Sequence, residues 1–267
     1  MAPIDVPSWT QLDMDAVCAR IRAVAFDLDN TLARSRKPML PWMAERFSTL
    51  TTLLPVAVIT GGRYGLVISQ ILDVLDAHAN RSHLHLMPTS GTRYYRWDGD
   101  DWRCVYAHDL GADLRDAAVA SLTDHAKELG LWLEGTWGPR IEDRGSQITF
   151  SALGQQAPVE IRERWDPDGT KRDALVRAVA ADLPELQVRA GGTTSVDISL
   201  RGYDKAFAIR ELASSLDLPV DRIMFVGDRM SSDGNDYPAA EAGSLAVRVT
   251  GPEDTARLCD ELIARLS

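Results

Sequence analysis

Short apolar runs without polar alternation recur along this chain. They occupy residues 23–26, 56–59, 84–87, 223–226 and 245–249, and several are bounded by Gly, Pro or Asp. A strand that is apolar on both faces is typical of a parallel sheet covered by helices on both sides. The pattern therefore predicts five buried strands in one parallel sheet.

Helical patterns separate the first three of these runs. Pro41 is suited to the start of a helix over residues 42–54, and apolar residues recur at helical spacing over residues 65–78. Alternating strands and helices predict right-handed crossovers between parallel strands. The expected fold class is α/β, with a Rossmann-like parallel sheet.

The middle of the chain has a different pattern. A β-hairpin is predicted over residues 94–106, and helices over 112–129 and 171–183 are interleaved with strand-like segments at 139–142, 147–151 and 195–199. This block is α+β, whereas both flanks are α/β, so we expect an inserted domain. We place the core at residues 1–106 and 201–267 and the insertion at residues 107–200.

Charge and cysteine content exclude several classes of protein. The net charge of −10 and the scattered basic residues argue against a nucleic-acid-binding surface. Cys18, Cys104 and Cys259 lack CxxC spacing, so we expect reduced, buried thiols and neither a disulfide framework nor a zinc site. The N-terminal segment is acidic where a signal peptide would be basic, and no run approaches the ~20 apolar residues of a membrane span. We expect a cytoplasmic protein without membrane or nucleic-acid partners.

Two carboxylates follow the first apolar run. Asp27 and Asp29 lie one residue apart, where the strand ends at the edge of the sheet that carries ligands in open α/β folds. Alternate residues of a strand share a side, so both carboxylates can converge on one cation, for which Mg²⁺ is the natural choice. The alternative is an ordinary polar turn, because Asp and Asn are favoured in turns.

Three further segments bring polar groups to helix or strand ends. Thr60 and Gly61 follow the second apolar run, and Asp228 follows the run at 223–226. Lys205 falls in the first turn of a predicted helix, where a cation is unfavourable unless an anion lies nearby. Taken alone, Thr60 could be an ordinary strand-end hydroxyl, Lys205 a solvated helix residue and Asp228 part of a turn. Their joint occurrence favours a Mg²⁺ site built by Asp27, Asp29 and Asp228.

These segments resemble the four motifs of haloacid-dehalogenase (HAD) superfamily phosphotransferases. The matches are DLDNT at 27–31, Thr60, Lys205, and Gly227-Asp228 followed by Asn235-Asp236. The resemblance implies that Asp27 is the phosphoryl-accepting nucleophile and Asp29 the general acid and base. It also implies that Thr60, Gly61 and Lys205 bind the phosphoryl group. Mg²⁺ would be held by Asp27, Asp228 and the Asp29 main-chain carbonyl, with Asn235 and Asp236 completing its shell.

The insertion lies between the second and third motifs and resembles a type IIB cap. The segments GDRMSSDGNDY at 227–237 and GGTTSVD at 191–197 are similar to those of eukaryotic-type phosphomannomutases. This similarity implies substrate contacts by Arg144, Ser195 and Asp197, although each could instead be an ordinary polar residue of a loop or strand. The type IIB resemblance is also compatible with a homodimer.

The sequence departs from those mutases in the residues that would hold a second phosphate. Gln155 takes the place of a cap arginine, Asn30 that of a glycine, and TGGR at 60–63 is closer to sugar phosphatases of type IIB. We therefore expect a Mg²⁺-dependent phosphatase acting on a sugar phosphate or similar small phosphomonoester. The alternatives are a phosphomannomutase-like phosphosugar mutase and a non-catalytic sugar-phosphate-binding protein. The sequence does not specify which sugar.

Overall fold

The computed structural model describes residues 4–267 and divides the chain into two compact units. The core unit comprises Met1–Ala107 and Tyr203–Ser267, and the inserted unit comprises His108–Gly202. These bounds lie within two residues of those expected from the change in sequence pattern. Each unit has a hydrophobic core of its own, so each is described separately.

A seven-stranded sheet forms the centre of the core unit, with strand order β11-β10-β1-β2-β3-β4-β5. Neighbours from β11 to β3 are parallel, and β4 and β5 extend the sheet as the antiparallel hairpin. The strands are β1 (Ala23–Phe26), β2 (Val56–Ile59), β3 (Leu84–Met87), β4 (Arg93–Trp97), β5 (Trp102–Ala107), β10 (Ile223–Gly227) and β11 (Leu245–Arg248). The predicted parallel α/β fold is thereby confirmed.

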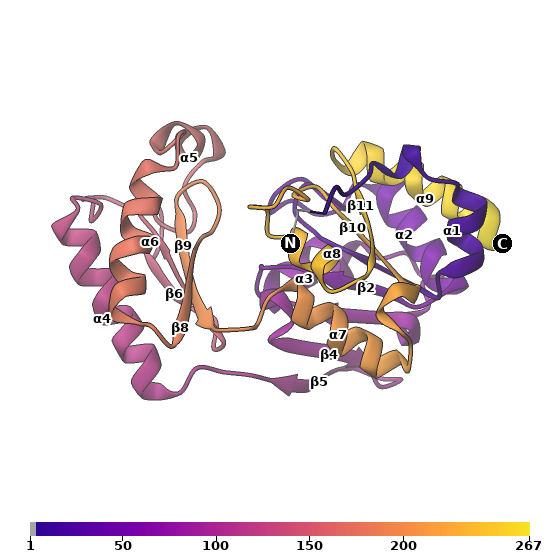
Figure 1. Ribbon diagram of the computed structural model, residues 1–267, viewed down its shortest axis with the longest axis horizontal. Helices are drawn as coiled ribbons and strands as arrows, with labels where there is room; N and C mark the ends of the chain where they lie inside the picture. Colours follow the sequence, from indigo (N-terminus) through magenta and orange to yellow (C-terminus); the bar gives the residue numbers. More distant parts are fainter. Residues whose placement is uncertain (1–3) are drawn as a thin grey trace. The chain divides into compact units, whose positions relative to one another are not determined.

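Helices cover both faces of this sheet, which explains why its strands are apolar throughout. The helices are α1 (Met14–Arg20), α2 (Pro41–Leu53), α3 (Tyr64–Gln70), α7 (Lys205–Leu216), α8 (Tyr237–Glu241) and α9 (Pro252–Leu266). In Figure 1, α1, α2 and α9 lie side by side. On one face of β1, Val24 and Phe26 pack in the hydrophobic cluster formed with α1, α2 and α9. On the other face, Ala23 and Ala25 pack in the cluster that contains α7 and α8.

Two expectations for the core unit were wrong. The helix expected at 65–78 ends at Gln70, because the Gln70 carbonyl accepts a hydrogen bond from the amide of Met39, and a 3₁₀ turn at Leu72–Val74 follows. Cys104 is exposed on β5, although Cys18 and Cys259 are buried as expected. The reason is that β5 is an edge strand, so its outer side chains have no sheet neighbour.

The inserted unit is a four-stranded antiparallel sheet with order β6-β7-β9-β8. Its elements are α4 (Ala112–Glu128), β6 (Ile141–Asp143), β7 (Gln147–Ser151), α5 (Val159–Trp165), α6 (Thr170–Asp182), β8 (Leu186–Ala190) and β9 (Ser195–Leu200). Sequence patterning missed β8 and α5. Alternate residues of β7 and β9, such as Ile148 and Ile198, pack with α4 and α6, and the opposite face of the sheet is polar.

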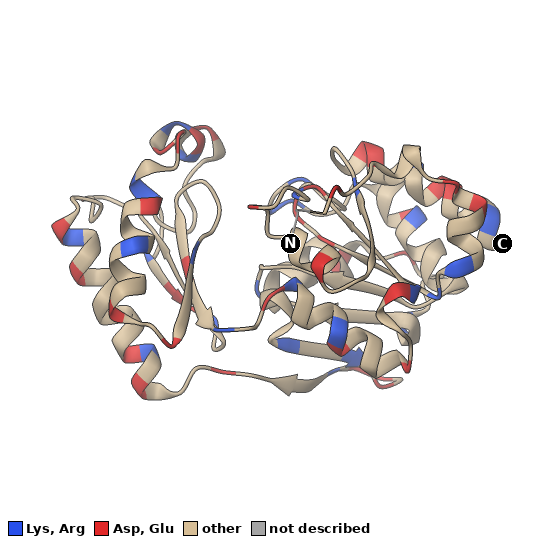
Figure 2. Cartoon of the chain, in the orientation of Figure 1, with Lys and Arg blue, Asp and Glu red and all other residues tan. Residues whose placement is uncertain are grey.

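Charges are distributed over both units. Figure 2 shows Lys and Arg interspersed with Asp and Glu along the helices. Among the described residues, no helix combines the length and apolar character that crossing a membrane requires.

Candidate active site

Two adjacent parallel strands bring the first and last acidic motifs together. Phe26 of β1 pairs in register with Val226 of β10, and the Asp27 amide donates to the Val226 carbonyl at 2.9 Å. Asp27 and Asp228 follow these strands directly, at the same edge of the sheet. Asp27 is buried and shielded from bulk water, whereas Asp228 is half-buried.

Lys205 lies between the carboxylates, at the first position of α7. Its Nζ contacts Oδ1 of Asp27 and lies 2.5 Å from Oδ1 of Asp236, and its side chain is 1% exposed. The preceding Asp204 caps the helix by accepting hydrogen bonds from two backbone amides. A cation at this helix N-terminus is therefore explained by the two carboxylates that it neutralises.

Three carboxylates gather around this lysine. One oxygen from each of Asp27, Asp228 and Asp236 lies within 4.8 Å of the other two. Burial raises the pKa of Asp27 to about 8 and also raises the pKa of Asp228, and neighbouring carboxylates act in the same direction. Burial lowers the pKa of Lys205, but Asp236 and Asp27 more than offset this and keep it above its ordinary value.

The donor set fits a hard divalent cation. Three carboxyl groups face one ammonium group, so two negative charges lack a partner within the cluster when all three are ionised, as they would be around a bound cation. Oxygen ligands from carboxylates are those that Mg²⁺ prefers. Among the described residues this is the one group of three or more acidic, His or Cys side chains arranged to hold a metal ion.

The loop after β10 restricts the conformation of the Asp236 side chain. Oδ2 of Asp236 accepts a hydrogen bond from the Arg229 amide at 2.9 Å. A Cβ at Gly227 would overlap the Asp236 carboxylate, so only glycine allows this approach. The neighbouring Asn235 is exposed, unlike the fully buried Asp236, and its place in a metal shell stays a prediction.

Asp29 is not one of the three carboxylates of this cluster, and its carboxylate has other hydrogen-bond partners. Its Oδ1 accepts hydrogen bonds from the Arg36 amide at 2.8 Å and from Nε2 of Gln70 at 3.1 Å. Asn30, next in the chain, has φ of 62°, a left-handed conformation that asparagine tolerates better than most residues.

Thr60 and Gly61 lie at the end of β2, beside β1. The Thr60 hydroxyl is buried and accepts a hydrogen bond from the Gly62 amide at 3.0 Å, which tightens the turn. Sequence reasoning missed Thr31, whose buried hydroxyl donates to Oδ1 of Asp228 at 3.4 Å. Its position two residues after Asp29 is the only signal that could have indicated this contact.

The predicted substrate residues of the inserted unit lie on or beside its polar sheet face. Asp197 pairs with Thr149 across β9 and β7, and the Thr149 hydroxyl donates to Oδ1 of Asp197 at 2.7 Å. Ser195 lies two residues earlier on the same face and is buried. Arg144 forms an ion pair with Glu142 at 2.7 Å, so part of its charge is already neutralised.

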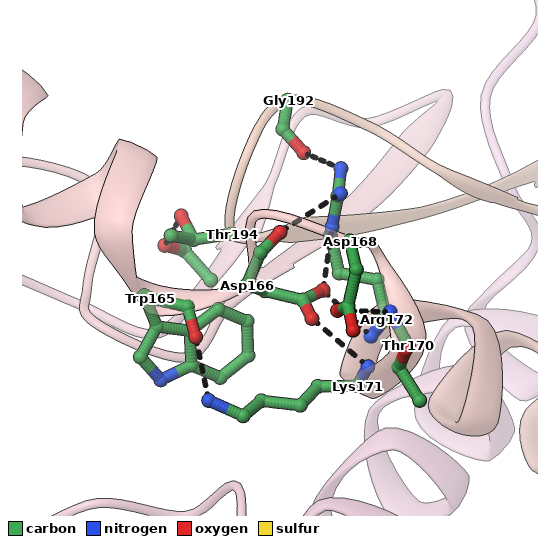
Figure 3. Close-up of polar contacts among 9 residues, drawn as sticks. Trp165, Asp166, Asp168, Thr170, Lys171, Arg172, Gly192 and Thr194 are labelled. Carbon is green, nitrogen blue, oxygen red and sulfur yellow. Dashed lines mark hydrogen bonds and ion pairs between the residues drawn. The ribbon is translucent and has the colours of Figure 1, made fainter.

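A charged cluster holds the loop that precedes Ser195. Figure 3 shows Arg172 of α6 reaching the carbonyl of Gly192 at 2.7 Å and the carboxylate of Asp166 at 2.9 Å. Asp166 also accepts hydrogen bonds from the amides of Lys171 and Arg172, at the start of α6. A Cβ at Gly191 would crowd the Asp197 carboxylate, so this loop and that carboxylate are packed together.

Comparison with known proteins identifies the family. The sequence pattern of the eukaryotic phosphomannomutases matches residues 49–265. The chain belongs to the eukaryotic phosphomannomutase family. A phosphomannomutase of Spinacia oleracea is 27% identical over 244 residues, which are 89% of this chain and 94% of that protein. A probable phosphomannomutase of Caenorhabditis elegans is 26% identical over 254 residues, 91% of this chain and 96% of that protein.

Two solved structures illustrate the fold that this chain shares. An IMP-nucleotidase of Plasmodium falciparum has a TM-score of 0.70 and 14% identity, over 94% of this chain and 70% of that one. A trehalose-6-phosphate phosphatase of Aspergillus fumigatus has a TM-score of 0.59 and 14% identity, over 97% of this chain and 100% of that one. At this identity the likeness concerns the fold alone. The expected resemblance to eukaryotic-type phosphomannomutases is confirmed by the family match.

Proposed function

We propose that this member of the phosphomannomutase family is a Mg²⁺-dependent phosphatase that hydrolyses a sugar phosphate or a similar small phosphomonoester. The observation that carries phosphoryl transfer is the buried cluster in which Lys205 contacts Asp27 and Asp236 beside Asp228. A carboxylate buried next to an ammonium group is poised to take a phosphoryl group whose other oxygens need positive partners.

The residues of the core unit divide the reaction into two steps. Asp27 attacks phosphorus as the bond to the sugar oxygen breaks, which forms an aspartyl-phosphate. Asp29 gives a proton to the departing oxygen and then takes one from the water that attacks the intermediate. Lys205, Thr60 and Gly61 hold the phosphoryl oxygens. Mg²⁺, when bound by Asp27, Asp228 and the Asp29 carbonyl with Asn235 and Asp236, would neutralise the repulsion between carboxylates and phosphate.

The inserted unit would select the substrate. Arg144 would bind an anionic or hydroxyl group distant from the reacting phosphate, and Ser195 and Asp197 would bind sugar hydroxyls. Gln155 supports hydrolysis over mutase activity, because it is a buried, neutral amide where the mutases carry a guanidinium. A mutase must capture a second phosphate, and the loss of one arginine weakens that capture.

A phosphosugar mutase is the second candidate, because the curated relatives that match nearly the whole chain are named phosphomannomutases. A mutase transfers the phosphoryl group back to sugar, so total ester phosphate is conserved and activity depends on a sugar bisphosphate. A phosphatase releases inorganic phosphate without that primer.

One experiment separates these functions. Release of inorganic phosphate is measured over a set of sugar monophosphates with Mg²⁺, with and without a sugar bisphosphate, and isomerisation is followed in parallel. Primer-independent release supports hydrolysis, and primer-dependent isomerisation without release supports the mutase. Asp27→Asn should abolish either activity, while Asp221→Asn, which alters an exposed carboxylate, should not. Full activity of Asp27→Asn, or a wild-type protein that binds but never turns over, would overturn the proposal.

A further inference from the structure

Gln70 is a buried amide that joins the last residue of α3 to the loop after β1. Its side chain is 1% exposed, and Nε2 donates to Oδ1 of Asp29 at 3.1 Å and to the Lys37 carbonyl at 3.0 Å. Both partners are acceptors, so they fix which end of the amide carries nitrogen. The Gln70 carbonyl also accepts from the Met39 amide at 2.9 Å. Three hydrogen bonds thus tie one residue to the segment 29–39.

The other end of this amide has no compensating contact. Oε1 of Gln70 is buried and has no hydrogen-bond partner among the residues that the structure describes. A buried polar atom without a partner costs about 1–3 kcal/mol of folding stability. This penalty offsets the stabilisation by the two hydrogen bonds that Nε2 donates, so the net contribution of the Gln70 amide to folding stability is small.

The hydrogen bonds on Asp29 distinguish its two oxygens. Oδ1 accepts from the Arg36 amide and from Gln70, whereas Oδ2 makes no hydrogen bond with any described residue. An oxygen that already accepts two hydrogen bonds is poorly suited to carry a transferable proton. Oδ2 is therefore the oxygen free to exchange a proton with substrate.

We propose that Gln70 is a positioning residue that fixes the Asp29 carboxylate with Oδ2 directed to proton transfer. This inference rests on the proposed function, in which Asp29 protonates the leaving oxygen. Gln70 itself touches no reacting atom. Without its amide, the Arg36 amide is the only described donor to Asp29, and the carboxylate can rotate so that Oδ1 and Oδ2 exchange places.

The test uses Gln70→Met, which keeps the volume but removes both the donor and the orphan acceptor. The thermal unfolding midpoint of Gln70→Met should change little, because the two hydrogen bonds donated by Nε2 and the penalty of the unpaired Oε1 are lost together. Turnover of a sugar phosphate should nevertheless fall by about 10- to 100-fold, in the range of general acid–base catalysis. Ile71→Val is the control, because Ile71 is buried next in the chain and makes no side-chain hydrogen bond. It should leave turnover within about twofold of the wild type.

Two further measurements separate positioning from a general loss of structure. An aryl phosphate with a good leaving group needs no proton donor in the first step, so Gln70→Met should keep the initial burst of phenolate release. In a double-mutant cycle, Gln70→Met should add less than a twofold loss to Asp29→Asn, because it acts through that carboxylate. Gln70→Glu, a second variant, puts an acceptor against Oδ1 and should lose at least as much turnover as Gln70→Met.

The inference is overturned if the double variant loses turnover by the product of the losses in Gln70→Met and Asp29→Asn. It is also overturned if Gln70→Met loses the phenolate burst together with sugar-phosphate turnover, or if Gln70→Met retains full turnover. Failure of the proposed function has a different signature, because then the wild-type protein shows no phosphoryl transfer or Asp27→Asn remains active. If Gln70→Met does not fold, the double-mutant cycle is run with Gln70→Glu, and multiplied losses in that cycle also overturn the inference.

Discussion

Replacement of Lys205 by methionine probes the charge balance on which the site depends. Lys205→Met keeps most of the side-chain volume but removes the ammonium group that contacts Asp27 and Asp236. Both carboxylates are almost fully buried, with 7% and 0% of their side chains exposed, so water cannot replace the lost partner. The variant therefore retains three converging carboxylates without any cation.

The size of the effect follows from this burial. Removal of one partner from a buried ion pair destabilises a protein by about 3–5 kcal/mol. At about 2–4 °C per kcal/mol for a protein of this size, the melting temperature should fall by roughly 6–20 °C. The matched control is Arg20→Met, which breaks the exposed pair with Asp221, and such pairs contribute about 1 kcal/mol or less.

The assay is thermal unfolding of Lys205→Met, Arg20→Met and the wild type in the presence of a chelator and then with excess Mg²⁺. Mg²⁺ should recover part of the lost stability, because a cation that binds only the folded state stabilises it. The loss should also be smaller below about pH 8 than above it, because burial raises the pKa of Asp27 to about 8 and its carboxyl group is neutral below that pH. A melting temperature of Lys205→Met within about 3 °C of the wild type in chelator would refute this reasoning.

Three further predictions concern other parts of the chain. Burial lowers the pKa of His85 to about 3, so the folded protein holds this imidazole neutral while the unfolded chain protonates it below pH 6.5. The free energy of unfolding should therefore decrease as pH falls below 6.5, by about 2 kcal/mol at pH 5. Denaturant titrations at several pH values should show that the free energy of unfolding depends less on pH in His85→Asn than in the wild type. Equal pH dependence in the two proteins would contradict the assignment. Arg144→Ala should raise KM for a sugar phosphate by roughly 10- to 100-fold with little change for an aryl phosphate, and equal effects would remove Arg144 from substrate recognition. Gly154→Ala should destabilise the inserted unit more than Gly135→Ala, because both glycines have positive φ but a Cβ at Gly154 would also overlap the Trp137 carbonyl. Limited proteolysis of the two variants compares them, and equal susceptibility would contradict the steric argument.

Sequence patterning was sufficient wherever one local rule decided the outcome. Apolar runs of strand length predicted the parallel sheet, because a strand covered on both faces has no polar alternation. The acidic residue after each of two such strands predicted that Asp27 and Asp228 would share an edge, since parallel neighbours end at the same side. An unfavourable lysine at a helix N-terminus likewise predicted a nearby anion, and Lys205 contacts two.

Contacts between distant segments were beyond the reach of these rules. The truncation of the helix at Gln70 depends on the Met39 amide, and the hydrogen bond from Gln70 to Asp29 spans 41 positions of the chain. Sequence spacing also gave no measure of the exposure of Asn235 relative to its buried neighbour Asp236. Such features depend on how a loop closes against other elements, which no periodicity encodes.

The sequence by itself thus determined the sheet, the inserted unit and the carboxylates at the strand ends, because hydrophobic period and strand direction are local properties. Only the tertiary structure decided that Lys205 sits between Asp27 and Asp236, that Glu142 pairs with Arg144, and that Gln70 holds Asp29. Those arrangements come from the packing of segments far apart in the chain, where burial and charge are set by neighbours that the local sequence does not contain.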